Sequence, residues 1–515
     1  MLDPNSTRLN RSKIVPLIEA AAFAANARAE GKRVVLCHGA FDVVHVGHIR
    51  HFEAAKKKGD VLCVSLTADK FIRKGPGRPV FNQGLRAEMV AALAAVDLVT
   101  IADDVTALPA IEAIKPHVYV KGAEYREHEK DVTGNIVLER EAAEKNGGAM
   151  EFTDELVFSS STLVNRHLDF HDTGVRAFLK DFTRRHSAAD VSGYLEKAAK
   201  LKVTIVGDVI IDEYNYVEPM GKSAKENMIA TLAQGREQFA GGVIAAANHI
   251  ASIVEQVDVV TLVGDEPEYV ELIKSSVVDN VRLHIIERPG APTTRKTRFI
   301  DEGPMRKLFE VYHMDDSPLL QDVRQAVDSE IKKSIANSDL VVVTDFGHGL
   351  LAQSSIDLLA KNSRFLAVNA QTNSGNAGFN LITKYPYANY VCIDTPEARL
   401  AVGEKFCSMK EILLERLPAR MRCDTLILTL GKQGCIVNVA NEAVSIPAFA
   451  QNVVDTVGAG DAFFAVTAPL AAIGAPSDFL GFIGNVAGAL KVEIVGHRKS
   501  IDKVSLIKAV TALLK

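Results

Sequence analysis

The stretch CHGAFDVVHVGHIRHFEAA, residues 37–55, contains four histidines and determines how the first part of the chain is interpreted. A short β-branched run, RVVLCHG at 33–39, overlaps its start and ends in glycine, and a helical stretch follows from His48. The sequence therefore predicts a strand, a tight turn and the start of a helix. Free N–H groups and the helix dipole at such a helix start favour anions.

The histidine cluster allows three interpretations. Zinc sites commonly use an HExxH pattern or paired cysteines, whereas His45 and His48 are separated by Val-Gly with no glutamate between them. The imidazoles could also simply cap the helix or pack against it. A phosphate site is favoured, because Gly47 lets the backbone approach a ligand and the two imidazoles would add donors for a phosphoryl group that gains charge in the transition state.

Composition places the chain among soluble globular proteins. Of its 515 residues, 47% are hydrophobic and 24% are charged, and the net charge is −5. Without a basic excess, we expect no nucleic-acid or membrane-surface partner. The six scattered cysteines include no CxxC pair, which is typical of reduced thiols in a cytoplasmic protein. The first residues lack the apolar region of a signal peptide, and no run approaches ~18 apolar residues, so no membrane span is expected.

Strand-like and helix-like runs alternate in the first part of the chain. This alternation predicts a parallel sheet in a doubly wound, Rossmann-like α/β domain, for which we expect the bounds 1–168. The runs that we expect to form strands are 33–39, 61–68, 97–103 and 117–122.

A charged helical connector is expected at 169–198, and a second α/β series follows it. At about 315 residues, this series is expected to form one large domain over 199–515 rather than two. Its expected strands are 201–212, 257–265, 339–347, 364–370, 390–394 and 425–431.

GAFDVVHVGH at 39–48 resembles the GxFDxxHxGH motif of the cytidylyltransferase-like nucleotidyltransferases. The resemblance continues in order through KGPGRPV at 74–80, Arg86, VKGAEY at 120–125 and SSSTLVNR at 159–166. These segments are similar to successive segments of heptose 1-phosphate adenylyltransferases. Several ordered motifs over about 150 residues are a specific signal, so a nucleotidyltransferase fold is expected for this part.

The resemblance implies roles for individual residues. The reaction needs no covalent step: a sugar 1-phosphate oxygen attacks the α-phosphorus of a nucleoside triphosphate, pyrophosphate leaves, and Mg²⁺ shares the charge neutralisation. His45 and His48 would contact the nucleotide phosphates as catalytic residues. Taken alone, Lys74 or Arg78 would be equally compatible with a solvated surface charge. The residues implied to bind nucleotide or phosphate are Gly39, Phe41, Lys74, Arg78, Lys121, Gly122, Ser160, Ser161 and Thr162.

A second glycine-rich motif, DTVGAGD, occupies residues 455–461. It is no Rossmann fingerprint, since G-x-G-x-x-G would directly follow the first strand of its domain. GKS at 221–223 is no Walker A motif either, because the glycine required five positions before Gly221 is Tyr216. A structural turn with a capping aspartate is the simple alternative for DTVGAGD.

DTVGAGD closely resembles the C-terminal signature of ribokinase-like (PfkB) sugar kinases. The resemblance implies that Gly458, Ala459 and Gly460 present backbone N–H groups to the transferring γ-phosphoryl group at a helix start. Asp461 would take the proton from the sugar hydroxyl as the general base.

Other segments resemble the same family on the sugar side. GDVIID at 207–212 places Asp212 where a sugar-binding aspartate is expected, and Gly241 and Gly242 lie at the family's substrate-side turn. A ribokinase-like α/β domain with a small β-lid is therefore expected.

Further segments resemble the nucleotide side and the lid. TLGKQG at 429–434 is similar to the nucleotide-side strand and turn, and Asn485 lies on the helix that flanks the adenine in such kinases. Lys222 and Glu226 fall in a segment similar to the β-lid of heptose 7-phosphate kinases, although exposed charges there would also suit a solvated loop.

Three departures from the heptokinase pattern concern the sugar and phosphate sites. This chain has Ala245 for Asn, Asn-Ala-Gln at 369–371 for Asp-Pro-Lys, and the pair Asp394 and Glu397 for the Asn-x-x-Glu pair near Mg²⁺ and the ATP phosphates. Replacing Asn by Ala removes a two-sided hydrogen bonder, a loss of about 1–3 kcal/mol if its partner stays buried and unpaired. We therefore expect either a different sugar or a weakened kinase, whereas the residues of the catalytic loop are all present.

The combination resembles the bifunctional heptose 7-phosphate kinase/heptose 1-phosphate adenylyltransferases, which supply ADP-heptose for lipopolysaccharide, although here the transferase-like part comes first. We predict a cytoplasmic homodimer that uses sugar phosphates, ATP (or CTP at the N-terminal site) and Mg²⁺ held through nucleotide phosphates, without a dedicated metal site. One alternative is a kinase and cytidylyltransferase that gives a CDP product from another sugar or polyol phosphate. Another is that one domain is a degenerate nucleotide-binding module.

Overall fold

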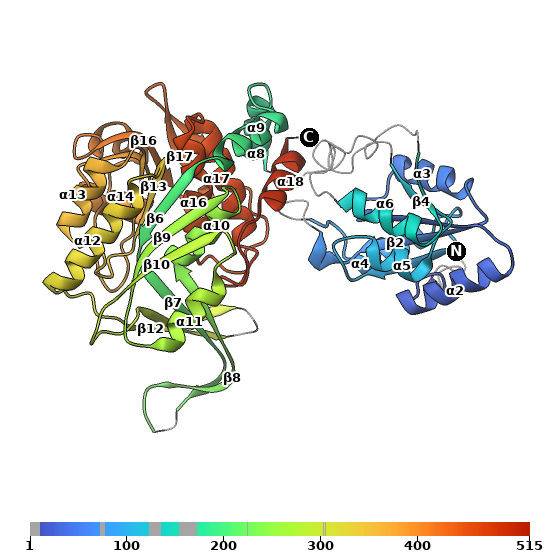
Figure 1. Ribbon diagram of the computed structural model, residues 1–515, viewed down its shortest axis with the longest axis horizontal. Coiled ribbons are helices and arrows are strands. Elements are labelled where there is room, and N and C mark those ends of the chain that lie inside the picture. Colours follow the sequence, from blue (N-terminus) through green and yellow to red (C-terminus); the bar gives the residue numbers. More distant parts are fainter. Residues whose placement is uncertain are drawn as a thin grey trace. The chain divides into compact units, whose positions relative to one another are not determined.

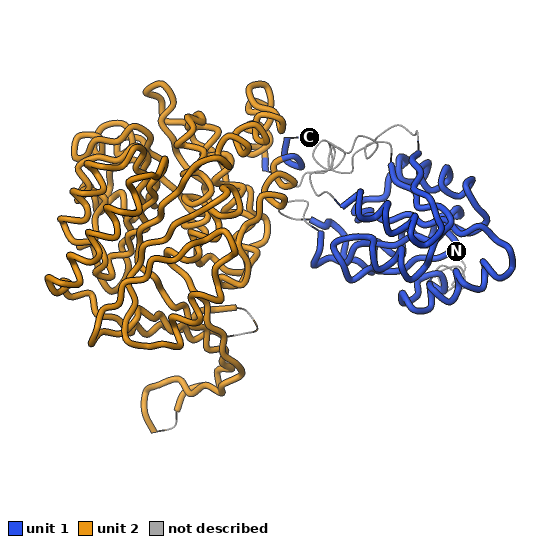
Figure 2. The backbone as a smooth tube through the Cα atoms, viewed as in Figure 1, with its two compact units in different colours: residues 1–172, 511–515 blue, residues 173–510 orange. Residues whose placement is uncertain are grey.

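The computed structural model describes residues 11–72, 78–122, 135–153, 172–223, 225–301, 303 and 305–514. The chain divides into two compact units, Met1–Asp172 with Thr511–Lys515 and Thr173–Val510 (Figure 2). Each unit contains its own sheet, parallel in the first unit and mainly parallel in the second, with helices against it (Figure 1), which confirms the expected pair of α/β domains. The predicted bounds 1–168, 169–198 and 199–515 remain a prediction.

The first unit contains a five-stranded parallel sheet with the strand order β3-β2-β1-β4-β5. Its strands are β1 (Val34–Gly39), β2 (Val61–Thr67), β3 (Leu98–Ala102), β4 (Val118–Lys121) and β5 (Ala149–Phe152). Its helices are α2 (Leu17–Ala29), α3 (Val46–Lys56), α4 (Gln83–Ala91), α5 (Leu108–Ile114) and α6 (Asn135–Lys145).

The two-residue period of β1 supplies both cores of the first unit. Val35 and Cys37 pack on one face with residues of α3 and α4, whereas Val34 and Leu36 pack on the other with residues of α2 and α5. Because helices cover both faces, the strand is apolar throughout rather than alternating. The strand order changes direction between β1 and β4, so a crevice is expected at the carboxyl ends of these two strands.

The second unit contains a nine-stranded sheet with the order β10-β9-β6-β13-β14-β15-β16-β17-β18. The strands from β10 to β16 pair in parallel, and β17 and β18 are antiparallel additions at one edge. They are β6 (Lys202–Gly207), β9 (Gln256–Val263), β10 (Val281–Glu287), β13 (Leu340–Asp345), β14 (Leu366–Ala370), β15 (Tyr387–Asp394), β16 (Arg422–Thr429), β17 (Cys435–Val439) and β18 (Glu442–Ile446).

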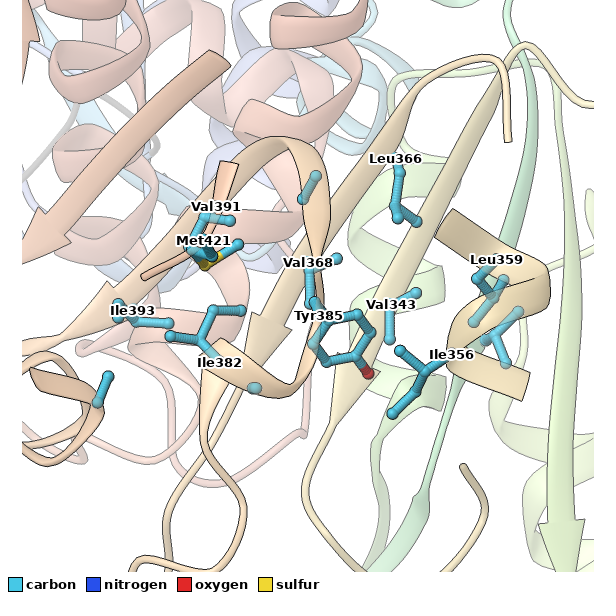
Figure 3. Packing of buried hydrophobic residues seen from close by; sticks show 14 of the residues in the cluster. Val343, Ile356, Leu359, Leu366, Val368, Ile382, Tyr385, Val391, Ile393 and Met421 are labelled. Carbon is cyan, nitrogen blue, oxygen red and sulfur yellow. The ribbon is translucent and has the colours of Figure 1, made fainter. Parts of the chain in front are cut away.

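Two sets of helices cover this sheet. One hydrophobic cluster joins alternate residues of the central strands, such as Val343 and Val368, to Ile356 and Leu359 of α13 (Figure 3). The other face carries α10, α16 and α17 (Figure 1). The helices of this unit are α8 (Thr173–Phe182), α9 (Ala188–Ala199), α10 (Val243–Ala251), α11 (Pro267–Ser276), α12 (Gln321–Ile335), α13 (Gln353–Asn362), α14 (Thr395–Val402), α15 (Met409–Glu411), α16 (Ala459–Ala472), α17 (Ser477–Lys491) and α18 (Lys503–Leu513), the last of which reaches the division between the units.

The segment predicted as a connector forms two helices that pack against the second unit. The ring of Phe182 in α8 lies 4.3 Å from that of Phe482 in α17, and the ring of Tyr194 in α9 lies 4.7 Å from that of Phe479. Within the described residues, no helix is long and apolar enough to cross a membrane.

A separate four-stranded sheet forms the lid, with the order β12-β11-β7-β8. Its strands are β7 (Val209–Lys222), β8 (Ile229–Gly242), β11 (Arg295–Asp301) and β12 (Arg306–His313), and β7 and β8 form the long hairpin in Figure 1. The run 201–212, expected as one strand, is split between the two sheets. The split occurs at Asp208, whose buried carboxylate accepts hydrogen bonds from the N–H groups of Phe346 and Leu350 and so anchors the chain where it leaves the large sheet.

Candidate active sites

The turn after β1 positions the predicted histidine pair. His45 is the N-cap of α3, and its Nδ1 accepts a hydrogen bond of 3.1 Å from the N–H of Gly47. The rings of His45 and His48 are stacked, with centroids 3.8 Å apart, and Phe41 meets His48 edge-on at 5.2 Å. Because Nδ1 of His45 accepts this hydrogen bond, the neutral ring carries its proton on Nε2, which is then the donor nitrogen of the ring.

The other two histidines of the opening stretch have separate surroundings. His38 lies 3.2 Å from the hydroxyls of both Ser65 and Thr67, and His51 lies 3.0 Å from the hydroxyl of Thr153. Burial, aided by the charge of Lys121, lowers the pKa of His38 to about 3 and that of His51 to about 4. Both are therefore neutral near pH 7. The described residues contain no group of three or more His, Cys, Asp or Glu that could hold a metal ion.

Two arginines of the ordered motifs are engaged within the protein. Arg78 forms a 2.5 Å ion pair with the fully buried Asp42, whose other oxygen accepts from the N–H of Val80. Arg86 is completely buried in α4 and donates to the carbonyls of Ala40, Thr67 and Phe81 while pairing with Asp69. Arg86 thereby fixes the turn after β1, a role that its place in the motif did not reveal.

Lys121 is the last residue of β4, which lies beside β1 in the sheet, and Gly122 follows it. The ammonium of Lys121 lies 2.9 Å from the buried carboxylate of Glu139, which also accepts from Tyr119 and from the N–H of Ala107. Burial alone would raise the pKa of Glu139, but Lys121 and the hydrogen bonds hold it below its ordinary value. Lys121 is thus held at the crevice as one half of an ion pair. Four predicted residues lie outside the described residues: Lys74, Ser160, Ser161 and Thr162.

In the second unit, DTVGAGD forms the loop that opens α16. Gly458 is the N-cap with φ of +75°, and a Cβ there would lie 2.8 Å from the ring of His497, so both the conformation and the space require glycine. The N–H groups of the first turn, from Ala459 onward, have no acceptor within the helix, although that of Ala459 lies 3.3 Å from the carbonyl of Thr456. The helix start therefore offers N–H donors to an anion.

Asp461 lies in the first turn of α16 and is half-buried. Its Oδ1 accepts a 2.5 Å hydrogen bond from the side-chain amide of Gln371. Burial raises the pKa of Asp461 above its ordinary value, and the nearby His497 and Gln371 only partly oppose this. A carboxylate with a raised pKa is a better proton acceptor than a free aspartate.

Asp212 on β7 is shifted in the opposite direction. Burial would raise its pKa, but His497, at 3.3 Å, and the ion pair with Arg298 hold the pKa well below its ordinary range. Gly241 permits this arrangement, because a Cβ there would overlap the carboxylate of Asp212. Two carboxylates whose pKa values are moved apart suit two roles, a permanent anion at Asp212 and a proton acceptor at Asp461.

Gly242 completes the turn between the lid and α10. Its φ is +57°, and a Cβ there would overlap the carbonyl of Asp208. Gly242 is therefore required by backbone geometry, whereas Gly241 is required by the space that the carboxylate of Asp212 occupies.

Asp394 and Glu397 form a reciprocal capping box at the start of α14, with both hydrogen bonds at 2.8 Å. Burial and the charge of Asp394 raise the pKa of Glu397 to about 8, and burial raises that of Asp394. A nearby cation would lower the pKa of both acids, because a positive charge favours their ionised forms.

Asn485 ties α17 to the end of the sheet. Its side-chain amide donates to the carbonyls of Ile446 and Pro447 at 3.0 and 3.1 Å, and the residue is buried. Asn369 likewise donates to the carbonyl of Cys392. Both amides are thus used within the protein, whereas Ala245 lines a cavity of about 320 Å³ together with His249 and His497.

Sequence reasoning did not assign a role to several residues that contact or lie near Asp212, Asp455 or Asp461. They come from the lid, from the end of β14 and from the last part of the chain, so no local pattern connects them. They are Arg298, Lys307, Gln371, Lys491 and His497.

The two units match two different family models. Residues 200–504 match the model of the pfkB family carbohydrate kinases, and because this match spans more than half of the chain, the chain belongs to that family. Residues 36–166 match the cytidylyltransferase-like model.

Curated relatives are similar over a shorter stretch. The chain is 36% identical over 150 residues to the bifunctional protein HldE of Syntrophotalea carbinolica, covering 28% of this chain and 29% of that protein. It is 40% identical over 132 residues to the HldE protein of Aliarcobacter butzleri, covering 25% of this chain and 27% of that protein. The chain thus matches less than a third of the length of these relatives.

Two solved structures align with 61% of this chain. Phosphofructokinase-2 from Escherichia coli in complex with substrates and products has a TM-score of 0.49 at 14% identity, covering 61% of this chain and 99% of its own. Ribokinase from Arabidopsis thaliana, complexed with ribose and ATP, has a TM-score of 0.45 at 16% identity, covering 61% and 99%.

Proposed function

We propose that the chain is a bifunctional enzyme, a sugar kinase and a sugar 1-phosphate nucleotidyltransferase, that makes a nucleotide-activated sugar of the ADP-heptose type. The observation that carries the proposal is the presence of Asp461, at a helix start that offers N–H donors, and of Asp212, whose pKa is held low, in the same chain as the stacked His45 and His48. Membership of the pfkB family and the similarity to bifunctional HldE proteins support it.

In the kinase reaction, Asp212 would accept a hydrogen bond from the sugar and hold it beneath the lid. Asp461 would take the proton of the attacking sugar hydroxyl while the oxygen of that hydroxyl bonds to the γ-phosphorus of ATP. The bond from the γ-phosphorus to the bridging oxygen breaks, and ADP leaves. The N–H groups at the start of α16 would stabilise the charge on the transferring phosphoryl group.

The residues near the proposed phosphate position fit a hydrated Mg²⁺. Asp394 and Glu397 provide hard carboxylate oxygens, and burial raises the pKa of both acids, so a nearby cation would favour their ionised forms. When bound through the nucleotide phosphates, Mg²⁺ would neutralise part of their charge.

In the transferase reaction, the oxygen of a sugar 1-phosphate would attack the α-phosphorus of the nucleotide at the crevice between β1 and β4. His45 and His48 would donate to the phosphate oxygens, and pyrophosphate would leave. Arg86 acts indirectly, because it fixes the turn that carries the two histidines. We further propose that the protein is a homodimer, on the basis of the family resemblance, and that it is cytoplasmic, on the basis of its composition.

The departures from the heptokinase pattern affect which sugar the kinase would bind. Ala245 leaves space next to His249 and His497, in the cavity of about 320 Å³. This observation also favours a second candidate, a kinase and cytidylyltransferase for another sugar or polyol phosphate.

A panel experiment tests the proposal. The purified protein is incubated with Mg²⁺ and ATP against a panel of sugar phosphates, and separately with heptose 1-phosphate against the common nucleoside triphosphates. ADP formation with heptose 7-phosphate, and pyrophosphate formation preferentially with ATP, are expected. A preference for CTP would replace the ADP-heptose assignment by the second candidate, and no turnover with any sugar would refute the kinase.

A further inference from the structure

Lys491, the last residue of α17, is a fully buried lysine. Its ammonium donates to the carbonyl of Val457 at 2.9 Å and to that of Gly496 at 2.6 Å. In the described part of the chain, both of its hydrogen-bond partners are thus backbone carbonyls rather than a carboxylate. Burying an ammonium is costly unless it is well satisfied, so its position calls for a physical explanation.

The same two residues that bind Lys491 also bind Asp455. The N–H of Val457 lies 3.1 Å from one carboxylate oxygen of Asp455, and the N–H of Gly496 lies 2.8 Å from the other. Asp455 therefore accepts hydrogen bonds from the two N–H groups, whereas Lys491 donates hydrogen bonds to the two carbonyls. An anion and a cation within the protein together fix the backbone directly before the glycine loop.

This arrangement determines the direction of one N–H group of the loop. Val457 immediately precedes Gly458, and in a planar trans peptide the N–H points opposite to the carbonyl. Because the carbonyl of Val457 is turned toward Lys491, the N–H of Gly458 is turned away from it. Gly458 also lacks the side chain that would crowd this lysine, since a Cβ there would lie 3.3 Å from Cε of Lys491.

The ammonium also acts on the charges around the reacting groups. Burial lowers the pKa of Lys491, and the carboxylates of Asp455, Asp461 and Asp212 oppose that shift, so all three lie within its electrostatic range. A positive charge at this position would likewise attract a phosphoryl group bound at the start of α16, in surroundings where water screens little.

We propose that Lys491 is a positioning residue of the kinase, an internal cation that orients the N–H of Gly458 and adds positive charge beneath the γ-phosphoryl group of ATP. The inference rests on the proposed kinase function and adds a residue to it. Lys491 touches neither substrate in this account and acts through the carbonyl of Val457 and through its charge.

Two substitutions separate the charge from the packing. Lys491→Met keeps most of the volume of the chain and removes the ammonium, whereas Lys491→Ala leaves a space that a small cation can enter. Lys361→Met is the matched control, since Lys361 lies in the last turn of another helix of the same unit, α13, and is exposed. Circular dichroism and thermal unfolding establish that each variant is folded.

Removal of the ammonium is expected to lower kcat for sugar phosphorylation by about 10²-fold, the typical effect of losing one anion-hole donor, here the N–H of Gly458 that Lys491 orients. ATP binding, measured by calorimetry, should weaken about tenfold while ADP binding stays near wild type, because the lost charge lies under the γ-phosphoryl group. Ammonium or methylammonium chloride should raise kcat of Lys491→Ala for sugar phosphorylation at least tenfold, relative to sodium chloride at equal ionic strength. Lys491→Met should not respond, because its side chain fills the space.

The inference is overturned if folded Lys491→Met has wild-type kcat and wild-type ATP binding, or if Lys491→Ala does not respond to either cation. It is also overturned if ATP and ADP binding fall equally, since that marks a purely structural lysine. If instead the proposed kinase function is wrong, the wild-type protein will bind ATP but phosphorylate no sugar. The difference between ATP and ADP binding in the variants then still decides the role of Lys491.

Discussion

Asparagine at position 461 would preserve the shape of the side chain and remove its ability to accept a proton. The structure specifies how Asp461→Asn would be oriented. The amide of Gln371 donates to Oδ1 of Asp461 at 2.5 Å, so the carbonyl oxygen of an asparagine would take that position. Its NH₂ group would then face the sugar, which places a donor where the mechanism needs an acceptor.

The expected loss follows from the role of a positioned base. Removing it typically costs about 10²–10⁴ in rate, or about 2.7–5.4 kcal/mol at 1.36 kcal/mol per factor of ten. kcat for sugar phosphorylation should fall by this factor. ATP affinity should stay the same or rise slightly, because a negative charge near the phosphates has been removed.

The assay measures ADP release with the best sugar of the panel, and ATP binding by calorimetry. Nucleotidyl transfer from preformed sugar 1-phosphate, measured in the same preparation, serves as the internal control and should be unchanged. If Asp461→Asn phosphorylates the sugar at the wild-type rate, Asp461 is not the base, and the account of the kinase site is wrong.

The remaining predictions concern both units. His48→Ala should lower nucleotidyl transfer by about 10²–10³ with kinase turnover unchanged, whereas stoichiometric zinc whose removal abolishes transfer would refute the phosphate role. Because the pKa of Asp461 is raised and Gln371 opposes that shift, kinase kcat should fall as pH drops through the Asp461 pKa, and Gln371→Leu should move this acidic limb to higher pH; an unmoved limb contradicts the assignment. Arg86→Met should destabilise the first unit by about 3 kcal/mol in urea unfolding, because buried carbonyls lose their donor, and an unchanged transition would refute that role.

Short stretches of sequence were sufficient to predict the backbone elements that carry both sites. The β-branched run before Gly39 and the histidines after it specify β1, the turn and α3, because a strand, a glycine and a helix cap are properties of neighbouring residues. The resemblance of DTVGAGD to the signature of ribokinase-like kinases implied a helix start, and the loop opens α16 with Gly458 at the cap.

What the sequence did not reveal depends on residues far apart in the chain. Gln371 reaches Asp461 across 90 positions, and Lys491 reaches Val457 across 34, so neither pairing leaves a local signal. The division of 201–212 between two sheets was missed for a related reason. Asp208 is fixed by backbone N–H groups near residue 346, and an apolar run by itself does not indicate where a strand changes sheets.

The central claim, that one chain carries out both reactions, is tested most directly by ³¹P NMR on a single preparation with Mg²⁺. One sample contains ATP and heptose 7-phosphate, and the other contains ATP and heptose 1-phosphate. We predict ADP with a new sugar 1-phosphate resonance in the first sample, and pyrophosphate with a nucleotide-sugar diphosphate in the second. If one reaction is absent with every sugar and every nucleoside triphosphate tried, while the other proceeds, the chain has a single activity and the claim is contradicted.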